Sequence, residues 1–209
     1  MFGLIRTVLI ACMAVLMLSL PVAAFSTNAR SAFVVDLSTG TVLLNKDADT
    51  PLPPASMSKL MTLYVAFEAL GDGRLTLDEK LPVSQHAMSY GGSTMFLDTT
   101  DRVRVEDLLR GIIVLSGNDA CVVIAEALSP DGTEAGFARY LTQRAQKLGM
   151  TNSTFPNAHG CPAPGQRMST HPLALLATHL NQDFTQYYSL FFEREVALYA
   201  LPPHILHHS

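Results

Sequence analysis

The sequence predicts one α/β domain. Two short runs with the composition of β-strands, 32–36 and 41–45, are separated by a tight connection at 37–40, which predicts a β-hairpin. Apolar residues recur at helical spacing in three later segments, 101–115, 120–128 and 133–148. Without its N-terminal segment the chain still has about 185 residues, enough for one domain with a hydrophobic core.

The first 24 residues have the pattern of a secretion signal. Arg6 supplies a positive charge, residues 7–20 are almost entirely apolar, and Ala23 and Ala24 are the small residues that signal peptidase requires. The apolar run is shorter than a comfortable membrane span. We therefore expect cleavage after Ala24 and export to the periplasm.

Composition excludes some classes of function and leaves others open. A net charge of −4 argues against binding to nucleic acid. Cys121 and Cys161 could form a disulfide after export, but Cys121 falls on an apolar helix, which favours a buried unpaired thiol. The histidines of the C-terminal tail have metal-like spacing with no carboxylate or cysteine beside them, so we expect no metal site there.

Polar segments and segments rich in Gly and Pro separate the remaining elements. They are a polar turn at 46–50, a possible strand at 77–83, a turn at 91–92 and a loop at 151–168. A helix should begin near Ser56 and end near 71–73. Pro172 fits the first turn of another helix after the long loop.

Ser56 and Lys59 form the first chemical motif. Three residues apart at the start of a helix, they lie on one face, so the hydroxyl and the amine come within hydrogen-bond reach. If burial lowers the pKa of Lys59, its neutral amine can take the proton from Ser56 and make it a nucleophile. The same spacing also arises by chance, with the serine capping a helix and the lysine in solvent.

Ser116 and Asn118 form the second motif, in a short break between two apolar helices. Polar side chains at such a break can point into a cleft while both helices stay buried. A hydroxyl there can relay protons, and an amide can hold both the substrate and Lys59. The Ser-x-Asn pattern alone is weak, because Ser26-Thr27-Asn28 has it as well.

The residues around these motifs make the assignment specific. The relevant stretches are Pro54-Ala55-Ser56-x-Ser58-Lys59-x-Met61-Thr62, Gly91-Gly92-Ser93-x-Met95-Phe96-Leu97, Arg110-Gly111-Ile112-Ile113, Ser116-Gly117-Asn118-Asp119-Ala120-Cys121 and Pro164-Gly165-Gln166-x-Met168-Ser169. In order and distance they resemble the penicillin-binding serine D-Ala-D-Ala carboxypeptidases, peptidase family S11. Cys161 departs from the pattern, because a larger apolar residue is usual there.

The resemblance implies a β-lactamase/transpeptidase-like fold, in which a helix cluster packs on an antiparallel sheet. It makes Ser56 the acyl-ester nucleophile, Lys59 its proton acceptor, Ser116 the proton relay and Asn118 a substrate-binding residue, with no cofactor. The implied reaction removes the terminal D-Ala from the pentapeptide stems of peptidoglycan. β-Lactams would inhibit because they acylate Ser56 and leave slowly.

The same family has features that the 209 residues do not contain. Its third motif, Lys-[TS]-Gly, supplies a cation and an oxyanion donor, yet no lysine follows Lys147. The resemblance fades after Glu195. We therefore expect a partial catalytic domain at 25–195 without its later strands, a tail at 196–209 unlike the family, and neither the family's C-terminal β domain nor its membrane-anchoring helix. A frameshift, a gene fragment or a genuine short form would each explain this ending.

Three alternatives remain at this point. The chain could be a non-catalytic fragment that only binds peptides or penicillins, because the third motif and later strands are missing. A class A β-lactamase fits poorly, since no glutamate lies between Glu134 and Glu193 to serve in deacylation. A Ser-His-Asp hydrolase fits poorly as well, because no serine lies in a Gly-x-Ser-x-Gly motif.

Overall fold

The computed structural model describes residues 26–196 and 206–207, so the segment expected to be a secretion signal and most of the tail lie outside the described residues. Its elements, in chain order, are β1 (Ala32–Val35), β2 (Val42–Lys46), the 3-10 helix η1 (Ala55–Ser58), α2 (Lys59–Gly71), β3 (Lys80–Pro82), α3 (Gln85–Met88), β4 (Arg102–Arg104), α4 (Val105–Leu115), α5 (Asn118–Leu128), α6 (Glu134–Lys147), α7 (Thr170–Asp183), the 3-10 helix η2 (Tyr188–Phe192), β5 (Glu195–Val196) and β6 (Leu206–His207).

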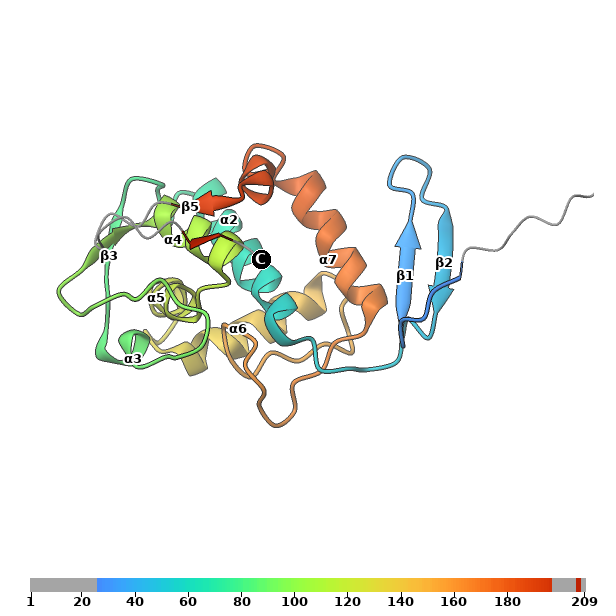
Figure 1. Cartoon of the computed structure of the whole chain (residues 1–209), viewed down its shortest axis with the longest axis horizontal. Helices are drawn as coiled ribbons and strands as arrows, with labels where there is room; N and C mark the ends of the chain where they lie inside the picture. Colours follow the sequence, from blue (N-terminus) through green and yellow to red (C-terminus); the bar gives the residue numbers. More distant parts are fainter. Residues whose placement is uncertain (1–25, 197–205, 208–209) are drawn as a thin grey trace, which may run out of the picture.

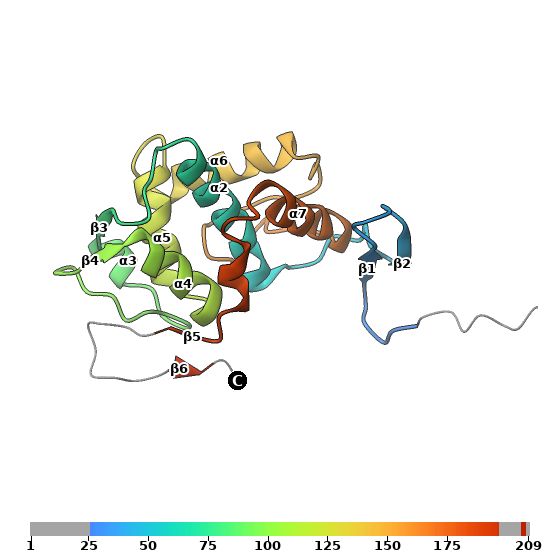
Figure 2. The same ribbon diagram turned by 90° about the horizontal axis from the view of Figure 1, so that it is seen from above.

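A cluster of helices forms the body of the molecule, and the β1–β2 hairpin lies at one end of it (Figures 1 and 2). The hairpin is antiparallel and places Ala32 opposite Lys46, with a register shift between Val34 and Val35. Helix α7 contacts both β1 and α2, so it joins the hairpin to the cluster. Helices on an antiparallel sheet are thus confirmed, and the described sheets are all two-stranded.

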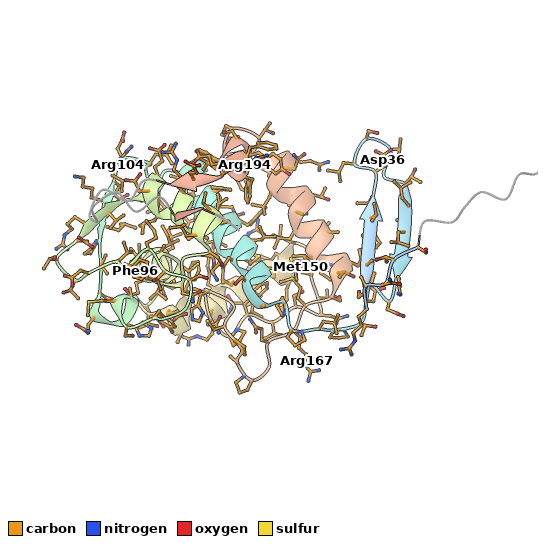
Figure 3. All side chains as sticks on the ribbon, in the orientation of Figure 1. Asp36, Phe96, Arg104, Met150, Arg167 and Arg194 are labelled. Atoms are coloured by element: carbon orange, nitrogen blue, oxygen red, sulfur yellow. The ribbon has the colours of Figure 1, made fainter. Side chains whose placement is uncertain are left out.

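Helix α2 is the centre of the hydrophobic core. It contacts α4, α5, α6 and α7, and Met61, Val65 and Phe67 on it are completely buried. The helix is apolar on almost every side, which is the pattern expected of a helix surrounded by protein. Met150, also fully buried, lies among the helices, whereas Arg104 and Arg167 lie at the periphery (Figure 3).

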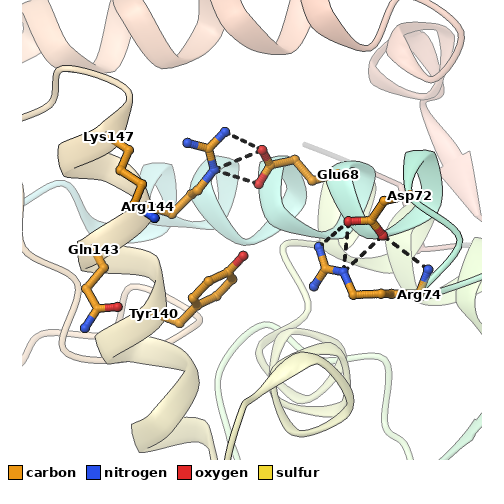
Figure 4. A pocket seen from close by; sticks show the side chains of 7 residues that line it. All are labelled: Glu68, Asp72, Arg74, Tyr140, Gln143, Arg144 and Lys147. Atoms are coloured by element: carbon orange, nitrogen blue, oxygen red, sulfur yellow. Dashed lines mark hydrogen bonds and ion pairs between the residues drawn. The ribbon is translucent and has the colours of Figure 1, made fainter.

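An ion pair fastens α6 to α2. The Nε atom of Arg144 donates to both carboxylate oxygens of Glu68 at 2.9 Å, and Arg74 forms a similar pair with Asp72 (Figure 4). A hollow of about 260 Å³ lies between these residues and Lys147. Because four of its five charged side chains are paired with each other, we read this hollow as structural.

Most boundaries expected from the sequence are confirmed. Helix α2 ends at Gly71, Thr133 caps α6 by accepting a hydrogen bond from the Gly136 amide, and Pro172 lies in the first turn of α7. The prediction of a helix at 101–115 is wrong in its first turn, because residues 102–104 are extended and pair with β3. Among the described residues, no helix combines the length and the apolar character needed to cross a membrane.

Candidate active site

Ser56 lies in a strained turn immediately before the central helix. The turn Ala55–Ser58 is a 3-10 helix, not the first turn of an α-helix, and Ala55 has a φ of +48°. A left-handed conformation costs about 1 kcal/mol or more outside glycine and is typical of functional sites. Ser56 is exposed, whereas Ser58 and Lys59 behind it are buried. The turn therefore presents the Ser56 hydroxyl at the surface on a rigid base.

Lys59 begins α2 with its amine directed back at this turn. Its Nζ lies 3.2 Å from Ser56 Oγ and donates a hydrogen bond to the carbonyl of His159 at 2.6 Å. Lys59 is only 4% exposed. Burial lowers the pKa of Lys59, and the nearby thiols of Cys121 and Cys161 oppose this shift. A larger neutral fraction of the amine is what a proton acceptor for Ser56 requires.

Ser116 and Asn118 lie on either side of a sharp change of direction between α4 and α5. Ser116 follows the last residue of α4 with a φ of +57° and is partly exposed. The amide of Gly117 closes α4 by donating to the Gly111 carbonyl at 3.0 Å. The break that the sequence suggested is therefore a left-handed turn, and it leaves the Ser116 hydroxyl outside both helices.

The Asn118 side chain is held within the protein. It is 5% exposed, and its Nδ2 donates to the carbonyl of Gly91 at 2.9 Å and lies 3.7 Å from the sulfur of Cys161. The structure thus brings Ser56 and Lys59 into direct contact. Within residues 26–196, no hydrogen bond joins the side chain of Ser116 or Asn118 to either of them.

Asp119 is a structural residue that the sequence analysis missed. It is 2% exposed, and its carboxylate accepts hydrogen bonds from the backbone amides of Met95 and Leu97 at 2.9–3.1 Å. The backbone amide of Asn118 also donates a hydrogen bond to the Ser93 carbonyl at 2.8 Å. These bonds fix the 93–97 loop beside the α4–α5 break. An acidic residue in the first turn of a helix was the available signal.

The sequence analysis also gave no role to Glu134 or His159. Glu134 is buried and accepts hydrogen bonds from Tyr90 Oη at 2.7 Å, His86 Nε2 at 2.9 Å and the Ala158 amide at 3.1 Å. Burial alone would raise the pKa of Glu134, but these bonds and the contact with His159 lower it to about 2. A charged carboxylate is therefore enclosed next to the loop whose His159 carbonyl binds Lys59.

Comparison with known proteins identifies the family. The family model for D-alanyl-D-alanine carboxypeptidase, Peptidase_S11, matches residues 19–201. The chain belongs to this family.

Relatives in the S11 family support the assignment. The chain is 39% identical over 153 residues to the D-alanyl-D-alanine carboxypeptidase DacF of Bacillus subtilis, covering 73% of this chain and 39% of that protein. It is 38% identical over 176 residues to DacC of Escherichia coli, covering 81% and 44%. The chain thus spans about two fifths of the length of these curated S11 relatives.

Solved S11 structures have the same fold. The D-alanyl-D-alanine carboxypeptidase DacD from Francisella tularensis superimposes with a TM-score of 0.84 at 31% identity, over 90% of this chain and 45% of that one. Penicillin-binding protein D2 from Listeria monocytogenes, in an ampicillin-bound form, gives 0.73 at 29% identity, over 86% and 71%. The β-lactamase/transpeptidase-like fold is thereby confirmed.

Both cysteines of the described part of this S11 chain are free thiols. Burial raises the pKa of Cys121 to about 12, so it is a packing residue. Cys161 is partly exposed and adjoins Asn118. In residues 26–196 and 206–207 no group of three or more His, Cys, Asp or Glu side chains is arranged to hold a metal ion.

Proposed function

We propose that this chain carries the acyl-enzyme chemistry of a serine D-Ala-D-Ala carboxypeptidase. Ser56 attacks the carbonyl of the terminal D-Ala-D-Ala peptide bond, and neutral Lys59 accepts its proton. Ser116 relays that proton to the departing D-Ala, and Asn118 binds the substrate amide. The observation that carries the proposal is the 3.2 Å contact between Ser56 Oγ and a buried amine whose pKa burial lowers.

The remaining steps follow from this pair. Attack leaves the shortened peptide as an ester on Ser56, and water then hydrolyses the ester to regenerate the serine. A β-lactam acylates the same oxygen, and because its opened ring stays attached, its ester is released slowly. We place this reaction in the periplasm, on the pentapeptide stems of peptidoglycan, where it would trim the cell wall.

Binding without turnover is the second candidate. Ser56 is exposed, and Met57 beside it is 50% exposed, so the described turn is open to water. Electrostatic stabilisation of an oxyanion is strongest in a site that excludes water. Within the 209 residues, no lysine after Lys147 is present to bind the substrate carboxylate. The acylation step is therefore the one to measure first.

A fluorescent penicillin tests the proposal. The 209-residue chain should become covalently labelled, Ser56→Ala should abolish labelling, and Lys59→Met should reduce it by about 1,000-fold or more, since the general base activates the nucleophile. Ser58→Ala, two residues along the same turn, is the matched control and should label. Labelling that survives Ser56→Ala, or a folded wild-type chain that never labels, would contradict the proposal.

A further inference from the structure

Residues 157–161, here called the wall segment, contact the nucleophile turn and the first turns of α2. The carbonyl of His159 accepts the hydrogen bond from Lys59 Nζ at 2.6 Å. One residue earlier, the carbonyl of Ala158 accepts a hydrogen bond from Thr62 Oγ1, also at 2.6 Å. Consecutive carbonyls of the wall segment are thus bonded to side chains one turn apart on α2.

Gly160 allows the wall segment to come this close. Its φ is +83°, and a Cβ atom added there would lie 2.1 Å from the carbonyl oxygen of Ala55 and 3.0 Å from Ser58 Cβ. Contacts of that length do not occur, so the turn that carries Ser56 packs directly on the Gly160 backbone. A displacement of the wall segment would therefore move the surroundings of both the nucleophile and its base.

Glu134 contacts the wall segment at Ala158 and His159. Its Oε1 accepts the bond from the Ala158 amide at 3.1 Å and lies 3.2 Å from His159 Nε2. His159 Nδ1 accepts a bond from the Cys161 amide, so in the neutral side chain the ring proton is on Nε2, which lies close to the carboxylate without the geometry of a hydrogen bond. The other oxygen, Oε2, is bonded to His86 in α3 and to Tyr90 just after this helix.

We propose that Glu134 is a positioning residue for acyl transfer: by anchoring Ala158 and His159 it sets the carbonyl that orients the Lys59 amine toward Ser56. This inference rests on the proposed function. A neutral amine has two protons and one lone pair. When one proton is bound to the His159 carbonyl, rotation of the amine is restricted and the lone pair can face the Ser56 hydroxyl.

The first test compares Glu134→Gln with Glu68→Gln. Glutamine keeps the size of Glu134 but offers one oxygen to the several donors that two oxygens now satisfy. Glu68→Gln removes the charge that pairs with Arg144 between α2 and α6, far along the chain from the wall segment, and serves as the control. We expect Glu134→Gln to lower the maximal rate of penicillin acylation by about 10- to 100-fold with little change in the half-saturating concentration. Glu68→Gln should leave both unchanged.

Amide hydrogen exchange gives a readout that does not depend on acylation. Glu134→Gln should accelerate exchange selectively in a peptide covering the wall segment, because the Ala158 amide then competes with Tyr90 and His86 for a single oxygen. Glu68→Gln should not. If no variant, including wild type, is labelled but exchange responds in this way, the proposed function fails while the anchoring stands. Unchanged exchange in the wall segment, or an unchanged acylation rate, would overturn the inference.

A second pair of variants keeps the test open if Glu134→Gln does not fold. His159→Gln retains a side-chain N–H near Glu134, whereas His159→Leu does not, and both remove the imidazole nitrogen that accepts from the Cys161 amide. We expect His159→Gln to acylate at least about tenfold faster than His159→Leu, since only it keeps an N–H group beside the charged carboxylate. Equal rates for the two folded variants would refute the positioning role.

Discussion

Acid should destabilise this protein in part through Glu134. The pKa of this buried carboxyl is about 2, against 4.5 for the unperturbed group. A lowered folded-state pKa means that the unfolded chain takes up the proton first, so stability present above pH 4.5 is lost as the pH falls toward 2. At about 1.4 kcal/mol per pH unit, the full loss is on the order of 3 kcal/mol, and roughly 2 kcal/mol of it should be gone by pH 3.

Urea denaturation at pH 7, 5, 4 and 3 measures this loss directly. Glu134→Gln should be less stable than wild type at pH 7, and the gap should shrink by roughly 2 kcal/mol at pH 3, because the variant has no proton to take up at this position. The comparison removes the contribution of every other titrating group that the two proteins share. A gap that stays constant from pH 7 to pH 3 would refute the assignment of a charged, hydrogen-bonded carboxylate at Glu134.

Four further outcomes follow from the site and the sequence. Burial lowers the pKa of Lys59, and the neutral amine is the reactive form. The penicillin acylation rate should therefore rise with pH, with a midpoint below the usual pKa of a lysine. A flat pH profile would contradict this. Gly160→Ala should lower the melting temperature more than Gly165→Ala. Both glycines have a φ of +83°, but only a Cβ atom at position 160 would lie within 4 Å of other atoms. Equal shifts would contradict the close packing at Gly160. The 209-residue chain alone should release D-Ala from a diacetylated Lys-D-Ala-D-Ala peptide at least about 100-fold more slowly than an intact relative, because it has neither the cation nor the oxyanion donor of the third motif. Comparable turnover by a folded monomer would refute this. Mass spectrometry of the exported protein should find Phe25 at its N-terminus, and an intact Met1 on cytoplasmic protein would show that no signal is removed.

Local chemistry explains why the sequence predicted much of the fold. The hairpin depends on a four-residue connection, and the end of α2 depends on Gly71 and the polar residues after it, all neighbours in the chain. The contact between Ser56 and Lys59 is equally local, because the two residues are three positions apart in the chain. The error at 102–104 has the opposite origin: pairing with β3, more than twenty residues earlier, overrides the helical pattern that begins there.

The residues that hold the site in place could not be predicted from the sequence in the same way. Glu134 bonds to Tyr90, 44 positions earlier, and to Ala158, 24 positions later, and sequence periodicity carries no information about either partner. The role of His159 was hidden for another reason, because its contact with Lys59 uses a backbone carbonyl that every residue type has. Side-chain motifs therefore indicate the reacting groups, while the groups that hold them are found only in three dimensions.

The left-handed backbone of Ser116 bears on how this protein would respond to engineering. Glycine adopts a φ of +57° without penalty, so Ser116→Gly should raise stability by about 1 kcal/mol while removing the hydroxyl. A library selected for heat resistance alone would drift to glycine at this position. Under our proposal, a library selected for penicillin labelling as well would keep serine. The difference in the frequency of serine at position 116 between the two populations would compare the contribution of the relay to activity with the stability that serine loses there.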